Sequence, residues 1–307
     1  KETGVSVEGK HVLMIAGAAA GLNVVLKALL NPGEEVIAIA PYFVEYGAYT
    51  KNQGGSFKVA NAVEGTFDLD VDAIEKTITP KTKAIILNSP NNPTGTVYPE
   101  ETLKKLSDVL SALEAKGQTI YVISDEPYIK IVYENVKVPA MLSVFKNSII
   151  VNSFSKSLAL PGERIGYIVV NPAIDGAELL MDGMIICART LGYVNAPSLF
   201  QKVIADNLEL ATGVDSYYER RNVLYDIIKR AGFECRLPEG AFYLFPKSPI
   251  PDDKAFCNKA LAHNLIVVSG AGFGYPGYFR LAYCVDMETI RRSEMAWMEL
   301  GKEFGLI

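Results

Sequence analysis

The chain has few of the residues that bind metals or form disulfides. Its two histidines, His11 and His263, are remote from one another in the sequence. The four cysteines are widely spaced and form no Cys-x-x-Cys pair: Cys187, Cys235, Cys257 and Cys284. Neither a metal centre nor a disulfide framework is therefore expected, and a reducing cytoplasm is the expected compartment.

Long hydrophobic runs and clusters of one charge sign are lacking too. The most apolar early stretch, residues 11–30, is broken by Asn23 and Lys27, so a membrane span is not expected. Lysine and arginine are scattered, and the formal net charge is −5. This charge distribution does not predict a surface that binds nucleic acid or an anionic membrane. Residues 1–9 are polar and lack an initiator methionine, so we expect that the natural N-terminal segment is missing.

Short apolar runs alternate with amphipathic stretches over the first two thirds of the 307 residues. The runs are continuous and rich in β-branched residues, which is typical of strands buried on both faces; they are Glu35–Ala40, Lys83–Asn88, Ile120–Ser124, Ser148–Asn152 and Ile165–Val170. Helical patterns lie at Gly17–Leu30, Asp70–Ile78 and Pro99–Lys116. This alternation predicts an α/β fold whose large domain has a mainly parallel sheet flanked by helices.

The pattern changes after about residue 210. Two long helical patterns, Val214–Gly232 and Met287–Phe304, flank β-rich segments at Ala241–Pro246 and Ile266–Ser269. They predict a second, smaller α+β domain at the carboxyl end. We place the large domain at residues 1–212 and the small domain at residues 213–307.

Chemically distinctive segments follow four of the predicted strands. They are Pro41-Tyr42-Phe43, the SPNNPTG segment that contains Asn92, the DEPY segment from Asp125 to Tyr128, and Ser153-Phe154-Ser155-Lys156. In an open α/β sheet, ligands bind beyond the carboxyl ends of the strands. We therefore expect an aromatic ring, an amide, a carboxylate with a tyrosine, and a lysine at one rim.

A fifth segment fits the same rim. Gly17, Ala18 and Ala19 open a helix directly after an apolar run, and free amides at a helix N-terminus bind phosphate. Ser153 and Arg164 can add a hydroxyl and a guanidinium to the same phosphate. An amine, a carboxylate, an aromatic face and a phosphate site together suit pyridoxal 5'-phosphate, which needs an amine for its aldehyde and a carboxylate for its ring nitrogen.

The motifs resemble, in order and spacing, those of the class I/II aminotransferases, the fold-type I family of pyridoxal-phosphate enzymes. They are SxSK followed by GxRxG, together with SPNNPTG and DEPY, and the resemblance runs from about His11 to the carboxyl end. It implies ping-pong transfer of an amino group between an L-amino acid and a 2-oxo acid in a homodimer. Aspartate-, alanine- and aromatic-type substrates all stay open.

The resemblance also implies roles for single residues. Lys156 would form the internal aldimine and carry the proton, and Asp125 would pair with the pyridinium nitrogen. Asn92 and Tyr128 would donate to the phenolic oxygen. Phe43 would stack on the ring, with its neighbour Tyr42 left as an alternative.

The remaining roles concern the phosphate and the substrate. The turn at Gly17 with the amides of Ala18 and Ala19 would hold the phosphate together with Ser153 and Arg164. The family has an arginine that grips the substrate α-carboxylate, and Arg280 matches it. Arg189 matches less well a position that reaches the partner subunit's site, and Gly240–Tyr243 is interpreted mainly as core strand.

Each role has a structural alternative. Asn92 can serve turn chemistry, Phe43 can be core, and Arg280 can be a surface ion-pair partner. Two other functions also stay open. One is a β-elimination lyase on the same fold, which needs no oxo acid, and the other is an aminotransferase-like effector domain of a transcription regulator with its DNA-binding part upstream.

Overall fold

A seven-stranded sheet forms the centre of the larger part of the molecule in a computed structural model, which describes residues 4–307. Residues 1–3 of the predicted large domain lie outside the described part. The strands are β1 (Val12–Ile15), β2 (Glu35–Ala40), β3 (Ser56–Asn61), β4 (Thr82–Asn88), β5 (Tyr121–Asp125), β6 (Ser148–Ser153) and β7 (Gly166–Val170). Their order is β1-β7-β6-β5-β4-β2-β3. Only β7 runs opposite to the other six strands, so the predicted mainly parallel sheet is confirmed.

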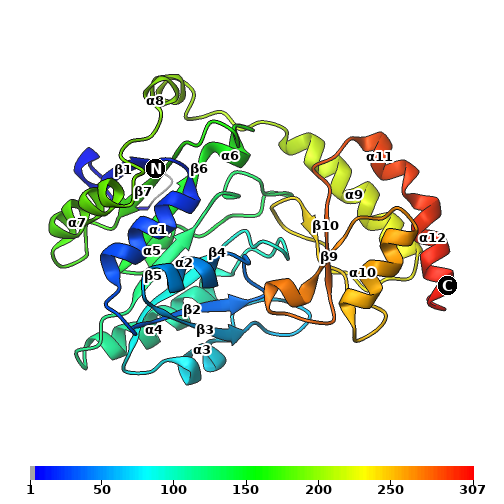
Figure 1. Ribbon diagram of the computed structural model, residues 1–307, viewed down its shortest axis with the longest axis horizontal. Coiled ribbons are helices and arrows are strands. Elements are labelled where there is room, and N and C mark those ends of the chain that lie inside the picture. Colours follow the sequence, from blue (N-terminus) through cyan, green and yellow to red (C-terminus); the bar gives the residue numbers. More distant parts are fainter. Residues whose placement is uncertain (1–3) are drawn as a thin grey trace.

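Helices cover both faces of this sheet (Figure 1). The helices of this larger part are α1 (Ala18–Leu29), α2 (Tyr46–Asn52), α3 (Val71–Thr77), α4 (Glu100–Glu114), α5 (Met141–Val144), α6 (Phe154–Ser157), α7 (Ala177–Thr190) and α8 (Ser198–Ala205), with a 3₁₀ helix η1 at Gly9–His11. One buried cluster joins α1 and α7 to one face, and another joins α3 and α4 to the opposite face. This two-sided cover explains why β2 is buried along its whole length and reads as a continuous apolar run.

The edge strand β3 was not predicted from the sequence. It pairs in parallel with β2 along all six residues, but most of its side chains are exposed. Its Lys58 lies 3.5 Å from the carboxylate of Glu35. Because an edge strand at this position faces solvent, it carries no apolar run of the kind that marks the central strands.

The carboxyl-terminal third builds a smaller α+β unit. Its helices are α9 (Val214–Arg230), α10 (Asp253–Ala262), α11 (Met287–Arg292) and α12 (Glu294–Glu303), and η2 is a 3₁₀ helix at Gly270–Phe273. An antiparallel sheet joins β8 (Tyr243–Leu244), β10 (Phe279–Ala282) and β9 (Val268–Ser269). The core of this unit also takes in Tyr128, Ile131 and Tyr133 from the loop after β5. A domain boundary between residues 212 and 213 stays a prediction.

One helix prediction was wrong in its continuity. The pattern at 287–304 indicated a single helix, but the chain forms α11 and α12 with a break at Ser293. The Ser293 hydroxyl donates to the carbonyl of Ile290 at 2.6 Å. A serine hydroxyl competes in this way with the helical backbone pattern, and the hydrophobic period does not record it.

No helix among residues 4–307 combines the length and the apolar character needed to cross a membrane.

Candidate active site

A cavity of about 330 Å³ lies beyond the carboxyl ends of β4, β5 and β6, where the first turn of α1 meets the loop before β7. Cavities of this size suit small molecules and cofactors. The predicted site residues that line it are Ala18, Ala19, Phe43, Asn92, Asp125, Tyr128, Ser153, Lys156, Arg164 and Arg280. The chain thus brings together, from segments up to 262 residues apart (280 minus 18), all of the predicted set except Gly17.

Gly17 contributes to the site without lining the cavity. It caps α1 with φ of +84°, and a Cβ built on it would stand 2.5 Å from Nη2 of Arg164. Only glycine tolerates both this backbone conformation and this close approach. The glycine therefore lets a guanidinium lie against the amide-rich start of α1, which is an arrangement that attracts an anion.

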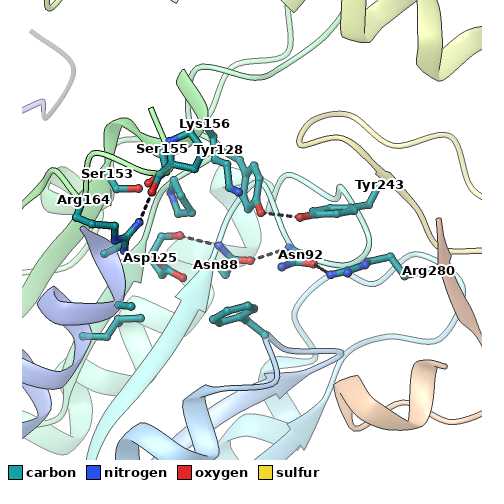
Figure 2. A pocket seen from close by; sticks show the side chains of 16 residues that line it. Asn88, Asn92, Asp125, Tyr128, Ser153, Ser155, Lys156, Arg164, Tyr243 and Arg280 are labelled. Atoms are coloured by element: carbon teal, nitrogen blue, oxygen red, sulfur yellow. Dashed lines mark hydrogen bonds between the residues drawn. The ribbon is translucent and has the colours of Figure 1, made fainter. Parts of the chain in front are cut away.

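Arg164 is held from its own side as well. Its Nη1 donates to the carbonyl of Pro161 at 2.7 Å, and its own φ of +50° is unusual for a residue with a side chain. Ser153, the last residue of β6, and Ser155, the second residue of α6, also line the cavity (Figure 2). Two hydroxyls and one guanidinium thus line the same cavity as the helix start.

Asp125 ends β5, lines the same cavity and is 5% exposed. Its Oδ2 accepts a hydrogen bond of 2.6 Å from the hydroxyl of Tyr46, whereas its Oδ1 is buried and has no partner among the described residues. Burial raises the pKa of this carboxyl to about 7, and the bond from Tyr46 opposes the rise. A buried oxygen left without a donor is what an N–H group of a bound molecule would satisfy.

A chain of hydrogen bonds runs from Asp125 across the floor of the cavity (Figure 2). The Nδ2 of Asn88 donates to the Asp125 carbonyl at 2.8 Å, and the Oδ1 of Asn88 accepts from the backbone N–H of Asn92 at 2.7 Å. The Oδ1 of Asn92 then accepts from Nη1 of Arg280 at 3.0 Å. Turn chemistry in this loop belongs to Asn91, whose Oδ1 accepts from the backbone N–H and hydroxyl of Thr94. The Asn92 side chain therefore takes no part in these turn bonds; it lines the cavity and binds Arg280 there.

Lys156 lies on the short helix α6, directly after β6, and is partly buried. Burial lowers the pKa of its amine, and the positive charges of Arg164 and Arg280 lower it further, against an opposite effect from Cys284. Its Nζ is 5.5 Å from the ring centroid of Phe242. A lysine with a lowered pKa has a larger neutral fraction, and the neutral amine is the nucleophilic form.

Arg280 comes from β10 of the small unit and is not a surface ion-pair partner. Its guanidinium carbon lies 4.5 Å from the ring centroid of Tyr243 and 4.8 Å from that of Phe273. With Nη1 bound to Asn92, its Nε is buried without a hydrogen-bond partner among residues 4–307. One edge of the guanidinium is thus left for an anionic group in the cavity.

The two aromatic candidates, Phe43 and Tyr42, have different surroundings in the structure. Phe43 lines the cavity and packs edge-on to Tyr46, with ring centroids 5.6 Å apart. Tyr42 packs against Phe57 at 5.2 Å, and its backbone N–H donates to the carbonyl of Phe273 at 3.0 Å. Phe43 is therefore the ring that a flat ligand would meet.

Arg189 lies apart from this cavity. It sits exposed in the last turn of α7 and is not among the residues that line the cavity in the described part of the chain. Its suggested contact with a partner subunit's site stays a prediction.

Sequence reasoning missed three residues of the site. Asn88 is the last residue of the predicted strand that precedes SPNNPTG, so its place at a strand end was a usable signal. Tyr46 follows Phe43 by three residues, but nothing local pairs it with a residue 79 positions away. Tyr243 was interpreted as core strand; it is buried on β8 and also lines the cavity.

An α/β fold with a lysine, a carboxylate and an anion-binding helix start in one cavity defines a class, the fold-type I enzymes. The family model for aminotransferase class I and II matches residues 1–293. A probable aspartate/prephenate aminotransferase of Thermus aquaticus is 31% identical over 297 residues, which cover 95% of this chain and 76% of that protein. A probable aspartate aminotransferase of Methanocaldococcus jannaschii is 32% identical and covers 94% and 76%.

Solved structures agree with the sequence comparison. A crystal structure of an amino transferase from Eubacterium rectale superposes with a TM-score of 0.96 and 42% identity over 98% of this chain and 76% of that one. The chain belongs to the class I and II aminotransferases, whose members use pyridoxal phosphate.

Proposed function

We propose that this chain binds pyridoxal 5'-phosphate in the 330 Å³ cavity and uses it to move an amino group between an L-amino acid and a 2-oxo acid. When bound, the cofactor supplies an aldehyde for the amine and a ring that withdraws electrons from the substrate. The observation that carries the proposal is the unpartnered Oδ1 of Asp125 in the cavity that also holds Lys156. A buried carboxylate oxygen of this kind suits a protonated ring nitrogen.

The donor set fits the other parts of the cofactor. The backbone amides of Ala18 and Ala19, the hydroxyl of Ser153 and the guanidinium of Arg164 suit its phosphate. Asn92 and Tyr128 suit the phenolic oxygen, and Phe43 suits one face of the ring. These groups come from separate segments that the sheet and Gly17 position around one cavity.

Lys156 and Arg280 would carry the chemistry and the substrate. The lowered pKa of Lys156 suits an amine that attaches the cofactor and later accepts the α-proton of the amino acid at Nζ. Arg280 keeps a free edge for the α-carboxylate, which a planar guanidinium binds through two parallel hydrogen bonds. This pairing favours α-amino acids over simple amines as substrates.

An oxo-acid requirement tests the reaction type. The purified protein is loaded with pyridoxal phosphate and given a panel of amino acids that includes aspartate, alanine and aromatic ones, with and without 2-oxoglutarate. An aminotransferase turns over repeatedly only when the oxo acid is present, and its cofactor spectrum changes in a single half-reaction without it. Sustained release of ammonia and pyruvate without an oxo acid would instead indicate the lyase, and absence of any turnover with loaded cofactor would favour a regulatory domain.

A homodimer is the expected assembly. Helices α7 and α8 expose apolar side chains, among them Leu179 (78% exposed), Ile186 (62%) and Leu199 (67%). Exposed apolar side chains of this kind suit contact with a partner subunit. Sizing of the cofactor-loaded protein tests this, and a monomer at every concentration would contradict it. Four free cysteines suit a cytoplasmic enzyme of amino acid metabolism.

A further inference from the structure

Tyr243 touches both ends of the site and has no role in the function proposed above. It lies on β8, is 7% exposed and lines the cavity. Its hydroxyl is 2.9 Å from the hydroxyl of Tyr128, and its ring centroid is 4.5 Å from the guanidinium carbon of Arg280. Figure 2 shows Tyr243 between these two residues. One side chain therefore contacts a group meant for the cofactor and a group meant for the substrate.

The number of protons decides which of the two hydroxyls donates the hydrogen bond. Each phenol has one hydrogen, and burial raises the pKa of both Tyr128 and Tyr243, so both remain neutral at ordinary pH. When Tyr128 donates its only hydrogen to the phenolic oxygen of the cofactor, its own oxygen can only accept. Tyr243 must then be the donor in the 2.9 Å contact. The hydrogen bond from Tyr243 polarises the hydroxyl of Tyr128 and strengthens the bond that Tyr128 donates to the cofactor.

The ring of Tyr243 has a separate effect. The Arg280 guanidinium lies over the rings of Tyr243 and Phe273, while its Nη1 is fixed by Asn92. Aromatic faces attract a guanidinium and favour one orientation of its plane. The Nε edge, which lacks a partner among the described residues, is thereby held ready for a carboxylate.

We propose that Tyr243 is a positioning residue with two separable actions: its hydroxyl directs the hydrogen of Tyr128 toward the cofactor, and its ring orients Arg280 for the α-carboxylate of the amino acid. The proposal rests on the proposed function. The two actions predict different experimental signatures, one in the titration of the bound cofactor and one in the binding of substrate.

Tyr243→Phe tests the hydroxyl. It removes one oxygen and keeps the ring, so the cofactor loads as in wild type. The pH at which the bound cofactor changes its absorbance should rise by roughly 0.3 to 1 unit, because the phenolic oxygen receives a weaker hydrogen bond. Tyr275→Phe is the matched control and should leave the titration unchanged, because Tyr275 packs against Phe67 and Tyr278 and is not among the described residues that line the cavity. An unchanged titration in Tyr243→Phe overturns the hydroxyl action.

Replacement of Tyr243 by pentafluorophenylalanine tests the ring, with Tyr243→Phe as its reference. Both variants lack the hydroxyl and have nearly the same shape, but fluorination removes the electron-rich ring face. The KM for the amino acid should rise roughly 2- to 30-fold relative to Tyr243→Phe, with kcat nearly constant. Equal KM values in the two variants overturn the ring action.

The outcomes separate this proposal from the proposed function. A wild-type protein that takes up no pyridoxal phosphate contradicts the proposed function itself. A wild type that loads and titrates, with both Tyr243 variants identical to it, contradicts only the role of Tyr243. Thermal melting of each variant shows that it is folded before it is titrated.

Discussion

The hydroxyl of Tyr46 donates a 2.6 Å hydrogen bond to one carboxylate oxygen of Asp125 and leaves the other oxygen buried without a partner among the described residues. The tyrosine starts α2, and the aspartate ends β5. This contact fixes the carboxylate and leaves one oxygen for a ligand. It also lowers the pKa of Asp125 against the rise caused by burial, so the site is easier to ionise than an isolated buried carboxyl.

Removal of this hydrogen bond should weaken cofactor binding. In Tyr46→Phe the pKa of Asp125 rises, because burial is then unopposed. A protonated carboxyl cannot pair with a ring N–H⁺, so the Kd for pyridoxal phosphate at neutral pH should increase roughly 10- to 100-fold, as for loss of a hydrogen bond to a charged group. Fluorescence titration with pyridoxal phosphate measures this Kd. Tyr225→Phe, on the partly exposed face of α9, is the control, and an equal Kd in both variants would contradict the role of Tyr46.

The empty protein should lose stability as pH rises toward neutrality. The pKa of Asp125 is raised from 3.8 to about 7 in the fold, so the folded state holds a proton that the unfolded state has released between these values. The stabilisation that this proton gives to the folded state is fully present below about pH 4 and is lost as pH rises to about 7. The free energy of unfolding falls by up to roughly 4 kcal/mol over this range. Urea unfolding of cofactor-free wild type and Asp125→Asn across this range measures it. A difference in the free energy of unfolding between the two proteins that does not change with pH would contradict the prediction.

Gly17→Ala should weaken binding of the cofactor's phosphate selectively. The new methyl group would stand 2.5 Å from Nη2 of Arg164 and displace it. Affinity for pyridoxal phosphate should fall roughly tenfold or more, whereas affinity for pyridoxal should change little. Gly33→Ala is a closely matched control, since its φ is also +84° but a Cβ there meets nothing within 4 Å. Both variants place an alanine at a positive φ, and the strain at Gly17 is severe because its ψ of 167° lies in a region almost confined to glycine. Equal phosphate selectivity in the two would rule out the proposed contact.

Arg280→Lys should raise the KM for the amino acid with a smaller effect on cofactor loading. Lysine keeps the charge but loses the planar guanidinium, so the KM should increase roughly 10- to 100-fold. Arg292→Lys, whose exposed side chain pairs with Glu288 one helical turn away, should leave KM unchanged. Steady-state kinetics with a saturating oxo acid measures both. A wild-type KM in Arg280→Lys would place the carboxylate elsewhere.

The central strands were predictable because their signal is local. The apolar run at 35–40 matches β2, and those at 83–88 and 148–152 lie within β4 and β6. The site motifs were equally local, because each one follows a strand. The edge strand β3 has no such run, and the break at Ser293 depends on one hydroxyl.

Contacts between distant segments were not predictable in the same way. Tyr46 and Asp125 are 79 residues apart, and Tyr128 and Tyr243 are 115 residues apart. Each pair forms only after the sheet or the small unit is packed, and neither residue's neighbours in sequence indicate a partner. The sequence therefore predicted which chemical groups reach the cavity, while the bonds that orient them needed the fold.

Attachment of the cofactor to Lys156 is the central claim, and one measurement tests it most directly. The protein is mixed with pyridoxal phosphate, reduced with borohydride, digested and examined by mass spectrometry. We expect one reduced cofactor per chain, on the peptide that contains Lys156, and none in Lys156→Ala; Lys137→Ala, an exposed lysine, should label like wild type. Stoichiometric labelling of a different lysine, or full labelling of Lys156→Ala, would contradict the account.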